Sequence, residues 1–317
     1  MESVLVTGGA GFIGSYVCER LLQEGHKVIC ADDFNDYYDP ERKKKNVAPF
    51  LSNKQFVLHH ADIRNKKVMD DIFKKHQCSY LIHLAARAGV RPSLADPVLY
   101  ADVNINGTLI LLDLAKAYKI KGFLFASSSS VYGFNKKIPF SEDDPVNEQA
   151  SPYGVSKRAG ELYCYAHHQL YGTPITCLRF FTVYGPRGRP DMAPYKFTRL
   201  IHEGKPIEMY GDGNSRRDYT YVSDIVDGIM AAMKKNYPFE IINLGNANPV
   251  KLKDFISIIE KNVGKQATIT QLPMQPGDLP ETYADVKKAE KLLGFKPKID
   301  IKEGMKRLVA WYQEEAA

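Results

Sequence analysis

Short apolar runs alternate with longer amphipathic stretches through the first 180 residues. Apolar segments predict strands at Val4–Val6, Val28–Ala31, Phe56–Leu58, Leu81–Leu84, Phe123–Ala126 and Ile175–Phe180. Helices are predicted between them, at Phe12–Glu24, Lys67–His76, Pro97–Tyr118 and Tyr153–Tyr171. Strands without polar alternation are typical of parallel strands that helices cover on both faces. The pattern therefore predicts an α/β fold with a doubly wound parallel sheet.

The alternation of apolar runs and amphipathic stretches becomes less regular after Gly185, where Gly- and Pro-rich turns separate shorter elements. Further helices are predicted at Tyr195–Glu203, Ser223–Lys235, Leu252–Val263 and Lys302–Glu314. We expect a larger domain at residues 1–180, to which a segment at about 215–245 returns. Residues 181–317 mainly form a smaller α/β domain in this interpretation.

Composition narrows the function classes. The 317 residues are 44% hydrophobic and 25% charged, which is ordinary for a soluble globular protein. The net charge of +6 is compatible with an anionic small-molecule substrate, but it does not indicate a protein that binds nucleic acid. The densest basic run, Lys43–Lys45, is predicted to be a solvated helix face. No apolar stretch approaches the ~18 residues of a membrane span and no signal peptide is visible, so no membrane partner is expected.

The cysteines and histidines give no sign of a metal site. The five cysteines are scattered and odd in number, which is typical of buried free thiols in a reducing compartment. The pairs His59-His60 and His167-His168 lack nearby partners that could complete a ligand set. We therefore expect a cytoplasmic protein without a bound metal.

A glycine-rich turn joins the first strand to the first helix. Thr7-Gly8-Gly9-Ala10-Gly11-Phe12-Ile13-Gly14 fits the spacing G-x-G-x-x-G from Gly9 and the spacing G-x-x-G-x-x-G from Gly8. Glycines let the backbone approach a pyrophosphate, which then lies on the free N–H groups of the helix N-terminus. Asp32, eighteen residues after Gly14, ends the second strand and can accept hydrogen bonds from ribose hydroxyls. This arrangement predicts a Rossmann-type NAD site rather than an NADP site, and the adjacent Asp33 is the alternative ribose contact.

Two further segments carry candidate acid–base chemistry. Tyr153 and Lys157 are four residues apart, so they lie on one helix face. A tyrosine has a pKa of about 10, and a nearby ammonium lowers that pKa and makes proton exchange with a hydroxyl feasible. Ser127-Ser128-Ser129-Ser130 follows the fifth strand at its carboxyl end, where doubly wound sheets bind ligands. A serine-rich turn and an amphipathic helix are the structural alternatives.

Together these motifs resemble a known family. The glycine turn, His83-Leu84-Ala85-Ala86, Asn104-Ile105-Asn106-Gly107-Thr108, the serine run, Tyr-x-x-x-Lys and Arg217-Asp218-Tyr219 occur in the order seen in extended short-chain dehydrogenases/reductases. Along nearly all its length the chain resembles a nucleotide-sugar epimerase of the UDP-glucose 4-epimerase type. The resemblance implies a Rossmann NAD-binding domain at 1–180 and a UDP-sugar-binding domain mainly at 181–317.

The resemblance also assigns roles to residues. It implies that Tyr153 and Lys157 are catalytic, with Ser128 as the catalytic hydroxyl and Ser130 as a second candidate. The expected cofactor contacts are Gly8, Gly11, Phe12, Ile13, Gly14, Asp32, Asp33, Asp62, Ile63, Leu84, Ala85, Ala86, Asn104, Tyr153, Lys157 and Phe180. The expected substrate contacts are Arg87, Ser128, Ser129, Thr182, Arg187, Arg189, Met209, Arg217 and Asp278.

The residues before Val131-Tyr132-Gly133 favour one reaction class. Related sugar 4,6-dehydratases carry Asp-Glu at this place and UDP-glucuronate decarboxylases carry Glu, whereas this chain has Ser129-Ser130. The absence of that carboxylate favours a redox-neutral epimerase, which is an isomerase. Segments 180–193 and 275–285 resemble UDP-glucuronate 4-epimerases, and Arg187 or Arg189 could pair with a C6 carboxylate.

Several interpretations stay open at this point. Gln275 stands where many UDP-glucose 4-epimerases have an arginine, and Thr282 stands where UDP-glucose-restricted relatives have a tyrosine. The first difference leaves open how the second diphosphate charge is met, and the second would make room for a larger C2 substituent such as N-acetyl. UDP-glucose and UDP-N-acetylglucosamine are the alternative substrates. A dehydrogenase that releases NADH and a non-catalytic dinucleotide-sensing protein are the alternatives from other classes. Tyr163, Ala166 and Leu170 form a packing stripe, and the resemblance implies a homodimer through this helix and Pro97–Tyr118.

Overall fold

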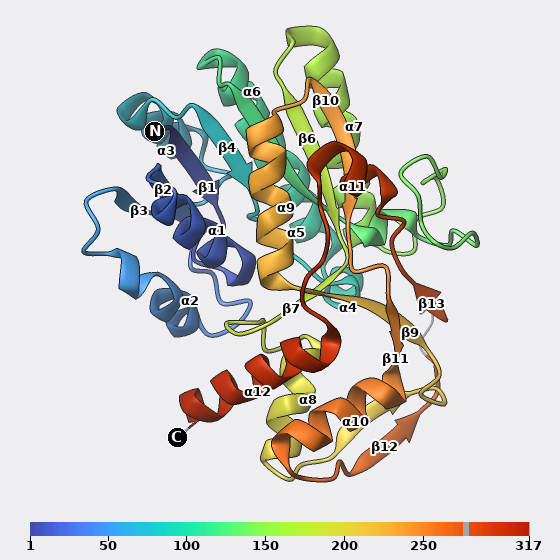
Figure 1. Cartoon of the computed structure of the whole chain (residues 1–317). Helices are drawn as coiled ribbons and strands as arrows, with labels where there is room; N and C mark the ends of the chain where they lie inside the picture. Colours follow the sequence, from blue (N-terminus) through green and yellow to red (C-terminus); the bar gives the residue numbers. More distant parts are fainter. Residues whose placement is uncertain (275–278, 317) are drawn as a thin grey trace.

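A seven-stranded parallel sheet forms the centre of the larger half of the molecule (Figure 1). The computed structural model describes residues 1–274 and 279–316. The strand order is β10-β6-β5-β4-β1-β2-β3, which confirms the predicted doubly wound topology. The strands are β1 (Ser3–Thr7), β2 (Lys27–Asp32), β3 (Phe56–His60), β4 (Tyr80–His83), β5 (Gly122–Ser128), β6 (Ile175–Phe180) and β10 (Phe239–Leu244).

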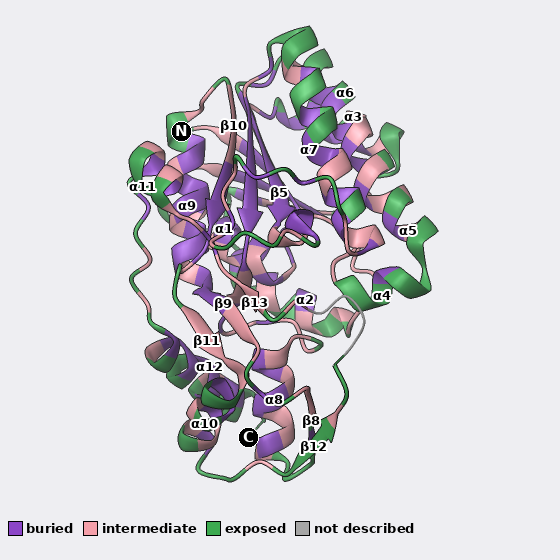
Figure 2. Ribbon diagram, turned by 90° about the vertical axis from the view of Figure 1, so that its right-hand side faces the viewer, coloured by how far each residue is buried: buried purple, intermediate pink, exposed green. Residues whose placement is uncertain are grey.

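Helices cover both faces of this sheet, as Figure 2 shows. In β1, Val4 and Val6 pack into one core with α1 (Phe12–Gln23) and α9 (Val222–Lys235). Leu5, between them, points into a second core with helices of the opposite face. That face carries α3 (Lys66–His76), α6 (Gly107–Ala117) and α7 (Pro152–Tyr171). Successive strand residues point to opposite faces and both faces are covered, which explains the uninterrupted apolar runs.

The predicted helix Pro97–Tyr118 is interrupted. The structure has α5 (Pro97–Ala101), a wide π turn at Asp102–Asn106, and then α6. The turn widens where Asn104 is buried and its amide bonds the backbone of Arg87. By length and composition alone the run Pro97–Ala117 could cross a membrane, contrary to expectation. In the folded chain this run packs against α7.

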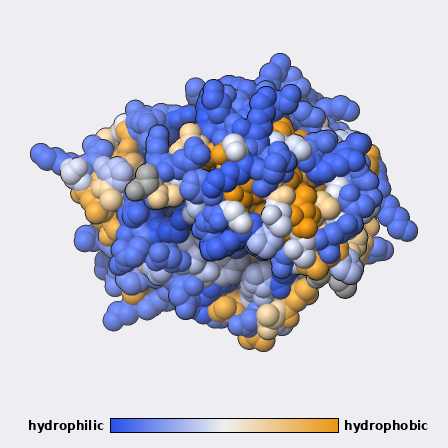
Figure 3. All heavy atoms as spheres, turned by 90° about the horizontal axis from the view of Figure 1, so that it is seen from below, coloured by the Kyte–Doolittle hydropathy of each residue, from blue (hydrophilic) through white to orange (hydrophobic). Residues whose placement is uncertain are grey.

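The remaining elements lie mostly beyond the carboxyl ends of the large sheet (Figure 1). A small sheet contains β7 (Thr182–Tyr184), β9 (Arg216–Tyr221), β11 (Pro249–Lys251) and β13 (Glu281–Thr282). A two-stranded sheet pairs β8 (Ile207–Tyr210) with β12 (Ile269–Leu272), next to α8 (Ala193–His202), α10 (Leu252–Val263) and α12 (Ile301–Ala316). Seen from below, the molecular surface is mostly hydrophilic, with apolar residues in separate patches (Figure 3).

Three short helices were not predicted by range: α2 (Pro40–Val47), α4 (Val90–Ala95) and α11 (Lys287–Leu293). The first begins at Pro40 and is preceded by the N-cap residue Asp39, whose carboxylate accepts the Glu41 N–H. The prediction of a solvated face at Lys43–Lys45 is wrong for Lys43, which is only 5% exposed. All five cysteines are buried and free, as expected.

Candidate active site

A cavity of about 700 Å³ lies at the carboxyl ends of the large sheet and reaches the small sheet. Most of the predicted site residues line it. They are Gly8, Gly11, Phe12, Ile13, Gly14, Asp32, Asp33, Asp62, Ile63, Leu84, Ala85, Ala86, Arg87, Ser128, Ser129, Ser130, Tyr153, Lys157, Phe180, Thr182, Arg189 and Arg217. Candidate cofactor and substrate residues therefore share one continuous space.

Three predicted residues in the described part of the chain are not in this lining. Asn104 lies behind it, and its amide nitrogen donates to Arg87 O and Ser156 Oγ, both at 2.9 Å. Arg187 points away and pairs with Glu19 at 2.9 Å. Met209 does not line the cavity either, and Asp278 lies outside the described residues.

The glycine turn uses the spacing that begins at Gly8. Gly8 has φ +69°, and a Cβ there would lie 2.7 Å from Ala85 N. A Cβ on Gly14 would lie 2.1 Å from Gly8 O, so neither position accepts a side chain. Gly11 precedes α1 and supplies no side-chain cap, which leaves the first N–H groups of the helix for a ligand. Gly9 instead packs on Cys30, because a Cβ there would lie 2.6 Å from Cys30 Sγ.

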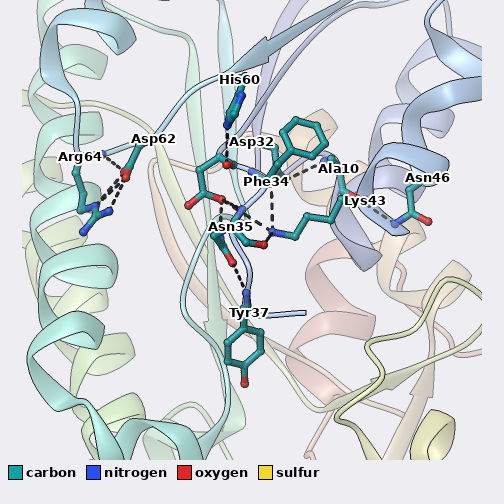
Figure 4. Close-up of polar contacts among 11 residues, drawn as sticks. Ala10, Asp32, Phe34, Asn35, Tyr37, Lys43, Asn46, His60, Asp62 and Arg64 are labelled. Atoms are coloured by element: carbon teal, nitrogen blue, oxygen red, sulfur yellow. Dashed lines mark hydrogen bonds and ion pairs between the residues drawn. The ribbon is translucent and has the colours of Figure 1, made fainter. Parts of the chain in front are cut away.

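Asp32 is fixed at the end of β2 and faces the cavity (Figure 4). Its carboxylate accepts the N–H groups of Ala10 (3.1 Å) and Phe34 (2.9 Å), which ties it to the glycine turn. Burial raises the pKa of Asp32, and the ammonium of Lys43 at 3.7 Å opposes this rise. Asp33 also lines the cavity and lies 4.0 Å from the same ammonium.

Lys43 was missed by the sequence reasoning. Its side chain reaches from α2 to the two aspartates and donates to Asn35 O at 3.2 Å (Figure 4). The signal was its helical spacing: Lys43 precedes the buried Val47 by four residues and so lies on the inner face of α2. The ammonium gives this end of the cavity a cation.

Asp62 is held by an ion pair at another edge of the cavity. Arg64 Nη2 lies 2.6 Å from Asp62 Oδ2, and Arg64 Nη1 lies 2.7 Å from Asp102 Oδ2. The hydrogen bonds from Arg64 lower the pKa of Asp62, which therefore stays ionised near neutral pH.

Tyr153, Lys157 and Ser128 all line the cavity. Burial raises the pKa of Tyr153, whereas a hydrogen bond with Ser128 and the charge of Arg189 lower it. The Lys157 ammonium donates to Ala126 O at 2.7 Å, and burial lowers its pKa to about 8. Ser128 Oγ accepts the N–H of Ser130 at 3.1 Å, so the two candidate hydroxyls are adjacent. Burial outweighs these two contributions, so the pKa of Tyr153 is raised rather than lowered as expected, and the opposing contributions come from Ser128 and Arg189 rather than from Lys157.

A buried polar network supports the strand that carries Ser128. Ser127 Oγ donates to Glu161 Oε1 at 2.6 Å, and Arg179 pairs with Glu161 through Nε (2.8 Å) and Nη2 (2.9 Å). Arg179 Nη1 also donates to the Tyr132 hydroxyl at 3.0 Å. Because Glu161 lies on α7 one turn after Lys157, this network fixes β5 against the helix of the Tyr-x-x-x-Lys pair.

The small sheet brings Arg217 and Thr282 to the other end of the cavity. Arg217 is in β9 and Thr282 is its register partner in β13. The neighbouring Asp218 is buried, and its carboxylate accepts the N–H groups of Asn246, Ala247 and Ala284 at 2.8 to 3.0 Å. Asp218 thereby joins β9 to the segments after β10 and β13.

Comparisons with known proteins agree with this site. The model of the NAD-dependent epimerase/dehydratase family matches residues 4–245. The chain is 45% identical to a UDP-glucuronate 4-epimerase of Thermodesulfobacterium geofontis, over 99% of this chain and 97% of that protein. It is similar in structure to the UDP-glucuronic acid 4-epimerase of Bacillus cereus in complex with UDP-glucuronic acid and NAD (TM-score 0.94, 38% identity, 99% of both chains). It is also similar to the UDP-glucose 4-epimerase of Thermotoga maritima with UDP-glucose (TM-score 0.90, 32% identity, 99% and 100%).

Proposed function

This chain belongs to the NAD-dependent epimerase/dehydratase family, and we propose that it interconverts UDP-glucuronate and UDP-galacturonate by epimerisation at C4. The observation that carries this proposal is Arg189. Its guanidinium lines the same cavity as Tyr153, and its charge lowers the pKa of that hydroxyl. A guanidinium so close to the acid–base group can hold a carboxylate on the reacting sugar.

The residues present fit NAD. The N-terminus of α1 offers free N–H groups for a diphosphate, and Asp32 offers a carboxylate for ribose hydroxyls. The rest of the expected cofactor site is lined by Asp62, Ile63, Leu84, Ala85 and Ala86. When bound, NAD supplies the two-electron acceptor that turns the C4 carbinol into a ketone and the donor that restores it.

Tyr153 moves the proton in this proposal. Its hydroxyl oxygen takes the proton from O4 of the sugar during oxidation and returns a proton to O4 after the sugar has turned over. Ser128 hydrogen-bonds the same oxygen, and Ser130 holds Ser128 in place. Lys157, buried beside Phe125, supplies the cation that favours the tyrosine phenolate. The sugar turns about its diphosphate, which Arg217 would anchor, while Asp278, which lies outside the described residues, would contact the ribose of the UDP.

A uronate substrate adds a problem that the site must solve. Its 4-keto form is a β-keto acid, which loses CO₂ readily when its carboxylate is aligned with the ketone. Ser129 and Ser130 bring no carboxylic acid to this place, and Arg189 can hold the sugar carboxylate out of that alignment. Epimerisation is therefore favoured over decarboxylation.

A C4-deuterated UDP-glucuronate tests the proposal. Protein loaded with NAD is expected to form UDP-galacturonate and to keep the deuterium at C4, which mass spectrometry detects. A UDP-pentose as the main product, or loss of the label to solvent, contradicts the mechanism. A parallel panel with UDP-glucose and UDP-N-acetylglucosamine tests the alternative substrates. Of these two, only the N-acetyl sugar would use the room that the small Thr282 leaves in the cavity wall.

We also propose a homodimer and a cytoplasmic location. Val98 of α5 and Leu170 of α7 are 76% and 71% exposed, and Tyr163 of the predicted stripe is also exposed. Exposed apolar side chains gathered on helices are typical of an interface between subunits. Sedimentation of the wild type and of Leu170→Glu tests this, because the variant is expected to be monomeric. The five free cysteines fit a reducing compartment, and fractionation of the source cells tests the location.

A further inference from the structure

The guanidinium of Arg189 already has a carboxylate partner within the chain. Arg189 Nε donates to Asp191 Oδ1 at 3.1 Å, and Arg189 Nη2 donates to Asp191 Oδ2 at 2.6 Å. This is the bidentate arrangement that an arginine uses to recognise any carboxylate. The sugar carboxylate of the proposed substrate would need the same kind of contact.

The other N–H groups of Arg189 do not offer a second free pair of donors for a bidentate contact. The Nη2 group also donates to the hydroxyl of Tyr37 at 3.2 Å. That hydroxyl donates in turn to Ala88 O at 2.7 Å, so Tyr37 is itself anchored. A planar guanidinium presents its five N–H groups in fixed directions. A second carboxylate therefore binds in bidentate fashion only if Asp191 or Tyr37 gives up its contact.

Asp191 is the partner that can leave. Its side chain is 40% exposed, whereas that of Arg189 is 19% exposed. Asp191 directly precedes Met192, the residue before α8, and can turn its carboxylate into water by rotating its side chain. Tyr37 is anchored at both its hydroxyl and its N–H, which donates to Asn35 Oδ1 at 3.1 Å.

We propose that Asp191 is a specificity-determining residue. Its carboxylate occupies the Nε and Nη2 donors of Arg189, the Arg189 fork, until the carboxylate of a UDP-uronate replaces it. The proposal rests on the proposed function, in which Arg189 holds that sugar carboxylate. A neutral hexose brings no competing charge, so the Arg189–Asp191 pair stays closed beside it. Asp191 thus sets how strongly the cavity distinguishes a uronate from a neutral sugar.

Removal of the Asp191 carboxylate should change the affinity of the protein for UDP-glucuronate. The apparent dissociation constant of a ligand equals its intrinsic dissociation constant divided by the fraction of the protein that is free to bind it. Exposed ion pairs are weak, so we expect Asp191→Asn to bind UDP-glucuronate about threefold to tenfold more tightly than the wild type. UDP-glucose binding is expected to stay unchanged, and Asp191→Glu is expected to restore the wild-type ratio of the two affinities.

Calorimetric titration of NAD-loaded protein with UDP-glucuronate and with UDP-glucose tests the proposal. Asp36→Asn is the matched control, because it removes an exposed carboxylate from the loop of Tyr37 and should leave both affinities unchanged. Weaker or unchanged binding of UDP-glucuronate by Asp191→Asn overturns the proposal, as does an equal change for both sugars. Failure of the wild type to epimerise UDP-glucuronate would overturn the proposed function instead, and the titrations report on Asp191 independently of turnover.

Discussion

Asp218→Asn should lower the stability of the half of the molecule that carries Arg217. The wild-type carboxylate accepts three backbone N–H groups: Asn246 N on Oδ1, and Ala247 N and Ala284 N on Oδ2. An amide has only one oxygen. If that oxygen accepts from the N–H groups of Ala247 and Ala284, the amide NH₂ group points at the N–H of Asn246. Two hydrogen-bond donors then oppose each other in a buried position.

The magnitude follows from these contacts. A hydrogen bond to a charged group contributes about 1.5–3 kcal/mol, so loss of one such bond is expected to cost about 2–3 kcal/mol. The unfolding entropy of a chain of 317 residues is about 0.7 kcal/mol/K near 60 °C, which converts the loss to a Tm lower by about 3–4 °C. The site has little room to adjust, since a Cβ on Gly245 would already lie 2.9 Å from Asp218 Oδ2.

Thermal unfolding followed by circular dichroism measures this change. Asp143→Asn is the control, because Asp143 is exposed and the substitution removes the same charge. A Tm within about 1 °C of the wild type for Asp218→Asn would refute the reasoning, because at about 0.7 kcal/mol/K such a change corresponds to less than one hydrogen bond. A loss as large for Asp143→Asn would refute it too, since the effect would then come from net charge.

Three further predictions concern the cavity. Tyr153→Phe should lower kcat by about 10²–10⁴-fold while UDP-sugar binding stays nearly intact, and retention of more than about a tenth of kcat in a coupled assay would contradict proton transfer by Tyr153. Lys43→Met should weaken NAD binding about tenfold in a calorimetric titration, because Asp32 loses its buried counter-ion, whereas Lys45→Met should have no effect. The pKa of Lys157 is lowered to about 8, so its ammonium is present below that pH and is lost above it. A pH profile of kcat should therefore decline through about pH 8, and a flat profile to pH 10 would speak against a role for this ammonium.

The features that could be predicted from the sequence depend on local patterns. The strand at Val4–Val6 was predictable because three consecutive apolar residues indicate a strand that is covered on both faces. In the structure Leu5 and its two neighbours are indeed buried, on opposite faces of the sheet. The glycine turn was recognisable because Gly8 and Gly14 admit no Cβ, whatever the rest of the chain does. The order of the motifs then placed Tyr153 and Ser128 at the same edge of the sheet.

Features that depend on distant partners could not be predicted. Arg187 and Arg189 are equivalent in the sequence, yet Arg187 has φ +61° and meets Glu19 of α1. Only the folded chain brings Glu19 near enough to draw one arginine away from the cavity. Lys43 had been interpreted as solvated, because nothing in the sequence near Lys43–Lys45 indicates that Asp32 would lie 3.7 Å from its ammonium.

The loop after β2 connects the expected ribose contact with Arg189. Asp32 begins this loop at the place where a ribose is expected, and Tyr37 lies five residues later with its hydroxyl 3.2 Å from Arg189 Nη2. Between them, Asn35 bonds both Lys43 and the N–H of Tyr37 (Figure 4). A displacement of this loop therefore disturbs the ribose contact and the arginine fork together. A cofactor held by Asp32 would therefore also steady Tyr37, whose hydroxyl accepts a hydrogen bond from Arg189.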